Sequence, residues 1–277
     1  MTEANARPAW DGVIELPVRD RTRKPRESGW TMVIDKGLGF NVIDDLMQNA
    51  APVIDVIKLT FGTSAFFRFD VLKEKVRTIV AHGVDCMPGG TLGEVAIWEG
   101  TYDRYLQRAR ELGFTAIEVS DGTIELDART RAGAIEKAVQ AGFRVLSEVG
   151  KKDPSDAQPM AVLADLVNSD LDHGAFMVIM EAREAGKGVG IYDASGLPRE
   201  AEIDAFLKGV KDPGRVLWEA PLGPQQRYLV LRFGPNVNLG NVAPEDILAL
   251  EALRCGLRGD TLKRAWLANR DFGTRGP

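Results

Sequence analysis

The sequence has few residues of the types that most often mark metal or nucleophilic sites. Among 277 residues there are two cysteines, Cys86 and Cys255, and two histidines, His82 and His173. The cysteine spacing argues against a disulfide scaffold and a structural zinc site. Each histidine directly precedes a glycine near the end of an expected helix, where a cation complements the helix dipole. We therefore expect no histidine-based mechanism.

Long apolar runs are also missing. No stretch reaches membrane-spanning length, and the N-terminus has no apolar signal-peptide core, so we expect a cytoplasmic protein without a membrane partner. The net charge of −5 gives no reason to expect nucleic acid as a partner. No Gly-x-Gly-x-x-Gly pattern follows the first apolar run, which leaves a dinucleotide-binding fold without support.

The sequence does contain a regular alternation of short apolar runs and amphipathic segments. Strands are expected near residues 31–34, 54–59, 84–87, 116–119, 143–149, 176–180, 216–219 and 236–239. Helices are expected around 42–50, 71–82, 99–112, 127–142, 158–172, 199–210, 225–233 and 244–257. The apolar runs are continuous, as in strands covered on both faces. Eight such units predict an α/β fold, a single-domain (β/α)8 TIM barrel. The alternative is a doubly wound open sheet.

We expect the barrel to span residues 30–265. A polar N-terminal extension, residues 1–29, precedes it and is interpreted as a loop or arm. A C-terminal tail, residues 266–277, follows it.

Ionisable side chains follow several of the apolar runs. In a TIM barrel the C-terminal ends of the strands meet on the face that carries the active site. Glu148-Val149-Gly150-Lys151-Lys152-Asp153 follows the fifth run and places two ammonium groups and two carboxylates within six residues. The other polar ends are Asp35-Lys36, Lys58, Pro88-Gly89-Gly90-Thr91, Glu118 with Ser120-Asp121, Glu181, Glu219, and Asn236, Asn238 and Asn241. Lysines and carboxylates without histidine or cysteine predict a phosphorylated or carboxylated substrate bound with Mg²⁺.

Several of these residues also have a structural interpretation. Lys36 could pair with Asp35 at the rim, and Lys58 could point into the barrel and pair with a carboxylate. Glu118 lies inside an apolar run, where an unpaired carboxylate is costly, so it is either salt-bridged or a ligand. The remaining alternatives are a simple tight turn at Gly89-Gly90 and solvated surface at Arg183, Glu184 and Lys187. These last three residues lie on a long glycine-rich segment, residues 182–198, which is a lid candidate.

The polar strand ends resemble those of the phosphosulfolactate synthase family. The similar segments are TMVIDKGLG at 31–39, PGGTL at 88–92, EVSDG at 118–122, EVGKKD at 148–153, EAREAGKG at 181–188, WEAP at 218–221, VNLGN at 237–241 and GLRGDT at 256–261. The resemblance runs from about residue 24 to 265. It implies a TIM-barrel lyase, in a homo-oligomer, that adds sulfite to phosphoenolpyruvate with Mg²⁺ and forms (2R)-phospho-3-sulfolactate. The alternatives are a diverged member with another nucleophile or enol-phosphate acceptor, and a non-catalytic stress-associated barrel.

The implied reaction gives each polar residue an expected role. Attack of sulfite at C3 places negative charge on C2 and the carboxylate, which Mg²⁺ and ammonium groups stabilise, and a general acid then protonates C2. Lys151 is the expected acid, with Lys152 and Lys58 next, because crowded positive charge would lower the pKa of an ammonium group. Lys36 is the fourth lysine expected in the site, where it would help to attract the anionic substrates. The expected metal ligands are Glu118, Asp121, Glu148 and Glu181. The expected substrate contacts are Gly89, Gly90, Thr91, Ser120, Arg183, Lys187, Asn238 and Asn241.

Overall fold

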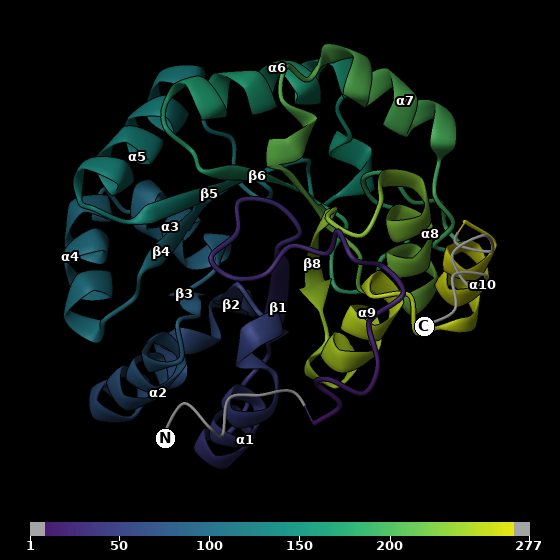
Figure 1. Cartoon of the computed structure of the whole chain (residues 1–277). Coiled ribbons are helices and arrows are strands. Elements are labelled where there is room, and N and C mark those ends of the chain that lie inside the picture. The colour runs from purple at the N-terminus through teal and green to yellow at the C-terminus, as the bar shows by residue number, and fades with distance from the viewer. Residues whose placement is uncertain (1–8, 269–277) are drawn as a thin grey trace.

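The computed structural model describes residues 9–268 and places eight parallel strands inside a ring of helices (Figure 1). The strands are β1 (Thr31–Asp35), β2 (Val56–Leu59), β3 (Asp85–Met87), β4 (Ala116–Val119), β5 (Arg144–Val149), β6 (Met177–Met180), β7 (Val216–Glu219) and β8 (Asn238–Val242). They pair in the order β3-β2-β1-β8-β7-β6-β5-β4. The amide of Thr115, just before β4, donates to the carbonyl of Cys86 in β3 at 3.2 Å. The barrel is therefore nearly closed, and the predicted (β/α)8 fold is confirmed.

The helices follow the strands in the order expected for this fold. They are α1 (Phe40–Ala50), α2 (Phe69–Ala81), α3 (Gly90–Trp98), α4 (Tyr102–Leu112), α5 (Ala128–Gln140), α6 (Met160–Asp172), α7 (Glu200–Gly209), α8 (Gly223–Phe233), α9 (Ile247–Arg254) and α10 (Gly259–Ala268). Local capping sets several boundaries. The Asp127 side chain accepts a 2.8 Å hydrogen bond from the Thr130 amide at the start of α5, and Gly113 ends α4 in the left-handed conformation.

Three boundaries differ from the sequence-based prediction. One helix was predicted over 99–112, but α3 begins directly at Gly90 and a break at Gly100 and Thr101 separates it from α4. The eighth strand was predicted to end at Leu239, but it starts at Asn238 and continues to Val242. A tenth helix, α10, follows α9. Gly90 and Gly93 in α3 and Gly240 in β8 concealed these two elements in part, because glycine contributes no apolar periodicity.

Alternation along the strands builds two layers inside the barrel. The lower layer is apolar and fully buried, and it includes Val56, Ala116, Leu146, Ile179 and Leu217. Side chains two residues apart on a strand point to the same face. The residue two positions later on each of these strands is therefore also directed inward: Lys58, Glu118, Glu148, Glu181 and Glu219. The strand pattern thus places one lysine and four glutamates on top of a dry core.

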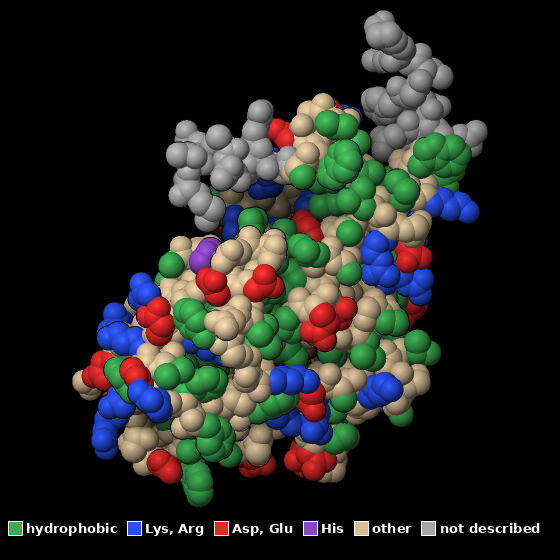
Figure 2. Space-filling view, turned by 90° about the horizontal axis from the view of Figure 1, so that it is seen from below, with side chains coloured by type: hydrophobic (Ala, Val, Ile, Leu, Met, Phe, Trp, Pro, Cys, Tyr) green, Lys and Arg blue, Asp and Glu red, His purple; other side chains and the backbone are tan. Residues whose placement is uncertain are grey.

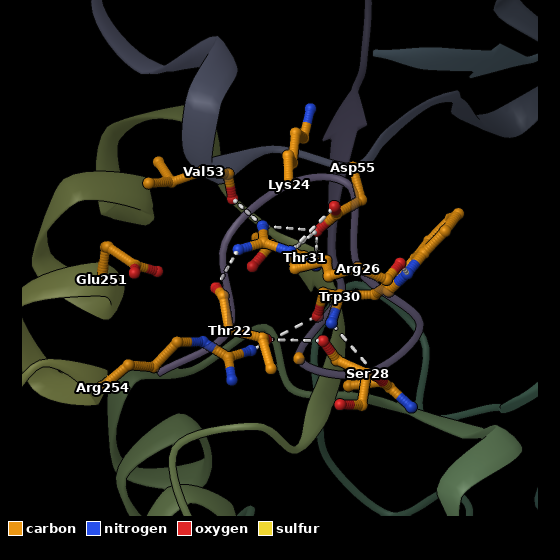
Figure 3. A network of polar contacts seen from close by, with 12 residues as sticks. Thr22, Lys24, Arg26, Ser28, Trp30, Thr31, Val53, Asp55, Glu251 and Arg254 are labelled. Carbon is orange, nitrogen blue, oxygen red and sulfur yellow. Dashed lines mark hydrogen bonds and ion pairs between the residues drawn. The ribbon is translucent and has the colours of Figure 1, made fainter. Parts of the chain in front are cut away.

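The N-terminal segment closes the opposite end of the barrel, as Figure 1 shows for the purple chain. Arg26 is the central contact (Figure 3): its guanidinium donates to Asp55 at 2.7 and 3.0 Å and to the carbonyl of Val53 at 3.2 Å. Asp55 also accepts a hydrogen bond from the amide of Thr31 at 2.8 Å, at the first residue of β1. The end of the extension around Arg26 therefore packs against the barrel and is not a free arm; residues 1–8 lie outside the described residues.

Breaking the Arg26–Asp55 pair should destabilise the fold. Both side chains are buried, at 2% and 4% exposure, so Arg26→Met leaves a buried carboxylate without its counter-charge. We expect the free energy of unfolding in urea to fall by about 3–5 kcal/mol. Arg23→Met is the matched control, because Arg23 is exposed on the same segment, and it should cost about 0.5 kcal/mol or less. Equal losses for the two variants would contradict this role of Arg26.

The molecular surface carries both signs of charge. Figure 2 shows lysine, arginine and acidic side chains interspersed on one face, with apolar side chains between them. This face therefore presents no continuous basic stripe of the kind that follows a nucleic-acid backbone. Among the described residues, no helix is both long and apolar enough to cross a membrane.

Candidate active site

A cavity of about 130 Å³ opens at the C-terminal end of the barrel. Most of its charged lining comes from the inward positions of the strands and from the loops that follow them. The lining residues are Ile34, Lys58, Thr60, Phe61, Gly89, Gly90, Thr91, Glu118, Glu148, Lys152, Glu181, Arg183, Glu184, Glu219 and Asn241. The cavity therefore collects residues from all eight strands or the loops after them.

Lys58 lies at the centre of the buried glutamates. Its Nζ is 2.8 Å from Glu118 Oε2, 2.9 Å from Glu148 Oε2 and 3.6 Å from Glu219 Oε1. All three carboxylates are 1% exposed. The alternative in which Lys58 points into the barrel and pairs with carboxylates is the one that the structure shows.

Burial and the mutual charges of these groups raise several of their pKa values. Burial alone would lower the pKa of Lys58, but Glu118, Glu148 and Glu219 raise it well above its ordinary value. Burial raises the pKa of Glu118 to about 7, even though Lys58 lowers it. Burial, with the charges of Glu148 and Glu219, also raises the pKa of Glu181. Lys58 therefore stays protonated, and the cluster contains carboxyl groups that can hold a proton near neutral pH.

The two adjacent lysines after β5 point in different directions. Lys152 lines the cavity, with its Nζ 3.5 Å from Thr91 Oγ1 and 3.7 Å from Glu148 Oε1. Lys151 instead donates to the carbonyls of Asp121 and Ile124 and pairs with the Asp121 carboxylate at 3.1 Å. The expectation that Lys151 is the inward acid is corrected by this geometry: Lys152 is the one that enters the cavity.

The expected cause of lysine activation is also corrected. A crowded positive site was predicted to lower the pKa of the catalytic lysine. Burial does act in that direction on Lys152, but the charges of Glu148, Glu181 and Glu118 outweigh it, and the pKa of Lys152 is raised. The carboxylates around the cavity outnumber the lysines. This excess was not apparent from the sequence, where each strand end was considered separately.

The start of α3 forms one wall of the cavity. The amide of Gly90 donates to Glu118 Oε1 at 2.8 Å, which fixes the carboxylate against the turn. A Cβ at Gly90 would collide with the Ser120 hydroxyl and with Glu118, so this position requires glycine. Gly89, Gly90 and Thr91 therefore bring the N-terminus of a nine-residue helix to the cavity, where its partial positive charge favours an anion.

A family model for (2R)-phospho-3-sulfolactate synthase (ComA) matches residues 19–260, which is most of the chain. The chain belongs to the (2R)-phospho-3-sulfolactate synthase family. Phosphosulfolactate synthase of Methanothermobacter thermautotrophicus is 47% identical over 244 residues, which cover 87% of this chain and 94% of that protein. The Methanocaldococcus jannaschii protein of the same name is 43% identical over 237 residues, covering 85% and 94%. The predicted family and the prediction of an enzyme are confirmed.

Solved structures support the fold and not the chemistry. The crystal structure of phosphonopyruvate hydrolase aligns with a TM-score of 0.53 at 16% identity, covering 89% of this chain and 84% of that one. Identity this low shows a shared TIM-barrel architecture and carries no conclusion on activity.

Several residues expected in the synthase-family site lie elsewhere. Asn238 is the first residue of β8, at the opposite end of the barrel, where it accepts from the Trp30 amide and donates to the carbonyls of Gly214 and Val216. Its assignment as a substrate contact is therefore wrong. Strand β8 begins two residues later than predicted, and Asn241, not Asn238, reaches the cavity.

Four further predicted residues do not line the cavity. Asp121 pairs with Arg131 and Lys151 at 2.9 and 3.1 Å, so its carboxylate stabilises the loops after β4 and β5. Ser120 is buried and donates to Glu94 at 2.6 Å. Lys36 lies over the Phe61 ring, 5.8 Å from its centre, and Lys187 is exposed on the 182–198 loop. Of these, Asp121 is removed from the expected metal ligands on geometric grounds.

Three residues at or beside the cavity were given no role by the sequence reasoning. Glu219 completes the ring around Lys58 and could have been found from its position two residues after Leu217. Glu94 is 2% exposed and accepts from Thr123 and Ile124 amides, and no sequence signal marks it. Arg131 on α5 donates to Asp121, Asp170 and the carbonyl of Glu148, and it thereby ties together the ends of β4 and β5.

The loop between β6 and α7 closes the cavity on one side. The Ala182 amide donates to Glu219 Oε2 at 2.8 Å, and the Arg183 amide donates to Glu181 Oε1 at 2.5 Å. Arg183 has a left-handed backbone (φ 59°), which is costly for a residue with a Cβ, and its side chain lines the cavity. Gln225 on α8 holds the same loop through the carbonyls of Gly186 and Gly196. The lid candidate thus bears a cation at the cavity mouth.

The cavity offers oxygen ligands that suit Mg²⁺. Glu148 Oε1 and Asn241 Oδ1 are buried in its wall and have no hydrogen-bond partner. In residues 9–268, no three histidine, cysteine, aspartate or glutamate side chains form a preformed metal-binding group. Mg²⁺ in enzymes is commonly held by one or two carboxylates together with water and substrate oxygens. The donor set therefore fits Mg²⁺ with Glu148 as the principal carboxylate.

Proposed function

We propose that this synthase-family enzyme adds sulfite to C3 of phosphoenolpyruvate and forms (2R)-phospho-3-sulfolactate. The observation that carries the proposal is the cavity itself, in which Lys152, Arg183 and the N-terminus of α3 surround a floor of buried glutamates. Three sources of positive potential in an acidic protein suit a small substrate with a phosphate and a carboxylate. The similarity to phosphosulfolactate synthases, which covers 87% and 85% of this chain, supports formation of the same product.

The chain's residues support each stage of this addition. The sulfur lone pair of sulfite forms the C3–S bond, and the π electrons of phosphoenolpyruvate move toward C2 and the carboxylate. Lys152 then donates its Nζ proton to C2, and water reprotonates the lysine. The phosphate ester is retained throughout. Lys58 stays protonated among the glutamates and holds them in place under the reacting carbons.

The remaining charged groups bind and orient the substrate. Gly89, Gly90 and Thr91 present the helix N-terminus to one anionic group, and Arg183 approaches from the loop. Glu148, with Glu181 and Asn241 beside it, would hold Mg²⁺. When bound, Mg²⁺ supplies electrostatic stabilisation of the negative charge on the substrate oxygens. The same cation would offset the excess of glutamates over lysines in the cavity.

A product assay tests the proposal directly. Purified protein incubated with phosphoenolpyruvate, sulfite and Mg²⁺ should consume phosphoenolpyruvate without releasing phosphate, and mass spectrometry should show the mass of phosphosulfolactate. Omitting sulfite is the control and should stop consumption. Turnover with a different nucleophile but not with sulfite would instead identify a diverged family member.

A further inference from the structure

The direction of Lys152 depends on a residue that has no side chain. The Lys152 amide donates to the carbonyl of Gly122 at 2.9 Å, so the loops after β4 and β5 lie against each other. A Cβ added to Gly122 would be 3.0 Å from Lys152 Cε, 3.3 Å from Cγ and 3.4 Å from Cδ. The aliphatic stem of Lys152 therefore runs directly over the face of Gly122 on its way to the cavity.

We propose that Gly122 is the positioning residue of Lys152: its missing Cβ leaves the channel through which the lysine reaches the reacting carbon. This inference rests on the proposed function for its effect on turnover. Neither a left-handed backbone nor a closer contact accounts for glycine at this position. Its backbone is not among the left-handed conformations of this chain, and the three nearest atoms to an added Cβ all belong to Lys152. Glycine is therefore needed at position 122 because of the Lys152 side chain, and not because of the backbone conformation of the turn.

The rest of the loop is held independently of Gly122. Arg131 is 3% exposed and donates to Asp121 and to the carbonyl of Glu148. Lys151 bridges the same two loops through the Asp121 carbonyl at 2.6 Å. Since these contacts fix the backbone, an alanine at 122 has to be accommodated by the flexible Lys152 side chain, whose Nζ then leaves its position.

Gly122→Ala tests the inference. We expect kcat for sulfite addition to fall roughly 3- to 10-fold, because the lysine stem has to give way to the added Cβ and misplacement of a reacting group by about 1 Å costs on the order of 100-fold. KM should change much less, and the midpoint of thermal unfolding should not fall. Gly133→Ala is the matched control: Gly133 lies within α5, an added Cβ there meets nothing within 4 Å, and activity should remain that of the wild type.

A double-mutant cycle separates positioning from general damage. In a Lys152→Ala background, Gly122→Ala should cause no further loss of activity beyond about twofold, because the group that it displaces is already absent. A wild-type kcat in Gly122→Ala, or an equal loss with and without Lys152, would overturn the inference.

A crystal structure of Gly122→Ala provides a readout that does not depend on the reaction. The distance from Lys152 Nζ to Glu148 Oε1, 3.7 Å here, should lengthen while the backbone of residues 120–124 stays in place. An unmoved lysine would refute the inference. If the wild type lacks sulfite-dependent turnover, the proposed function fails, and this measurement still decides the role of Gly122.

Discussion

Lys152→Ala is expected to lower kcat for sulfite addition by roughly 10²–10⁴-fold, the range typical for loss of a positioned general acid. Its Nζ is the ammonium group that enters the cavity from the loop after β5, 3.5 Å from Thr91 Oγ1 at the start of α3. Since the side chain is 29% exposed, the fold should tolerate its removal. Steady-state kinetics with detection of the product by mass spectrometry, alongside circular dichroism, measure both effects.

Lys151→Ala is the matched control for this prediction. Lys151 is the neighbouring residue, has the same chemistry and is 12% exposed, but its ammonium group is used by Asp121 and Ile124. Its loss should reduce the free energy of unfolding by about 1–3 kcal/mol and leave kcat within about tenfold of the wild type. The opposite ranking of the two variants, with both folded, would return the acid role to Lys151.

The barrel and the location of its charged floor could be predicted from the sequence. Continuous apolar runs predict strands covered on both faces, and each run ended in a polar residue. Strand alternation then determines the rest. Because Val56 and Leu146 face the barrel interior, Lys58 and Glu148 must do so as well. Applied to every strand, the same rule would have added Glu219 to the predicted site.

The directions of side chains on loops could not be predicted in this way. Lys151 and Lys152 are adjacent and chemically equal, and their different directions are set by Asp121 on one side and Gly122 on the other. Both partners lie about 30 residues earlier in the chain, on the loop after β4. Asn238 was misplaced for a related reason: a shift of two residues in the start of β8 moves an asparagine from one end of the barrel to the other.

The balance of positive and negative charge in the cavity also could not be predicted by counting the residues at strand ends. The sequence suggested a positive site, because four lysines follow predicted strands. In the structure Lys36 and Lys151 are directed elsewhere, whereas Glu118, Glu148, Glu181 and Glu219 all converge on the cavity. The two lysines that remain therefore have raised pKa values. The charges of the glutamates decide this outcome, because burial by itself would lower the pKa of both lysines.

Lys58→Met should be the most destabilising single substitution in the cavity. Methionine matches the length of the lysine stem but leaves Glu118, Glu148 and Glu219, each 1% exposed, without the ammonium group that contacts all three. Removing one partner from a buried ionic cluster typically costs about 3–5 kcal/mol. Urea unfolding of the metal-free protein measures the loss. Lys263→Met, at an exposed position on α10, is the matched control and should cost about 0.5 kcal/mol or less.

The loss caused by Lys58→Met should also depend on pH. Burial raises the pKa of Glu118 to about 7 in the wild type, and the charge of Lys58 is the largest effect that lowers it. Without Lys58, the folded-state pKa of Glu118 in the variant should therefore be higher still. A carboxyl group with a raised folded-state pKa binds more protons in the folded protein, and stability then falls as pH rises from the unfolded pKa through the folded one. The deficit of the variant relative to the wild type should therefore be larger at about pH 8 than at about pH 5.5. A deficit that is equal at both pH values would show that the glutamates do not depend on Lys58 for their charge, and that the lysine acts in this cavity through packing alone.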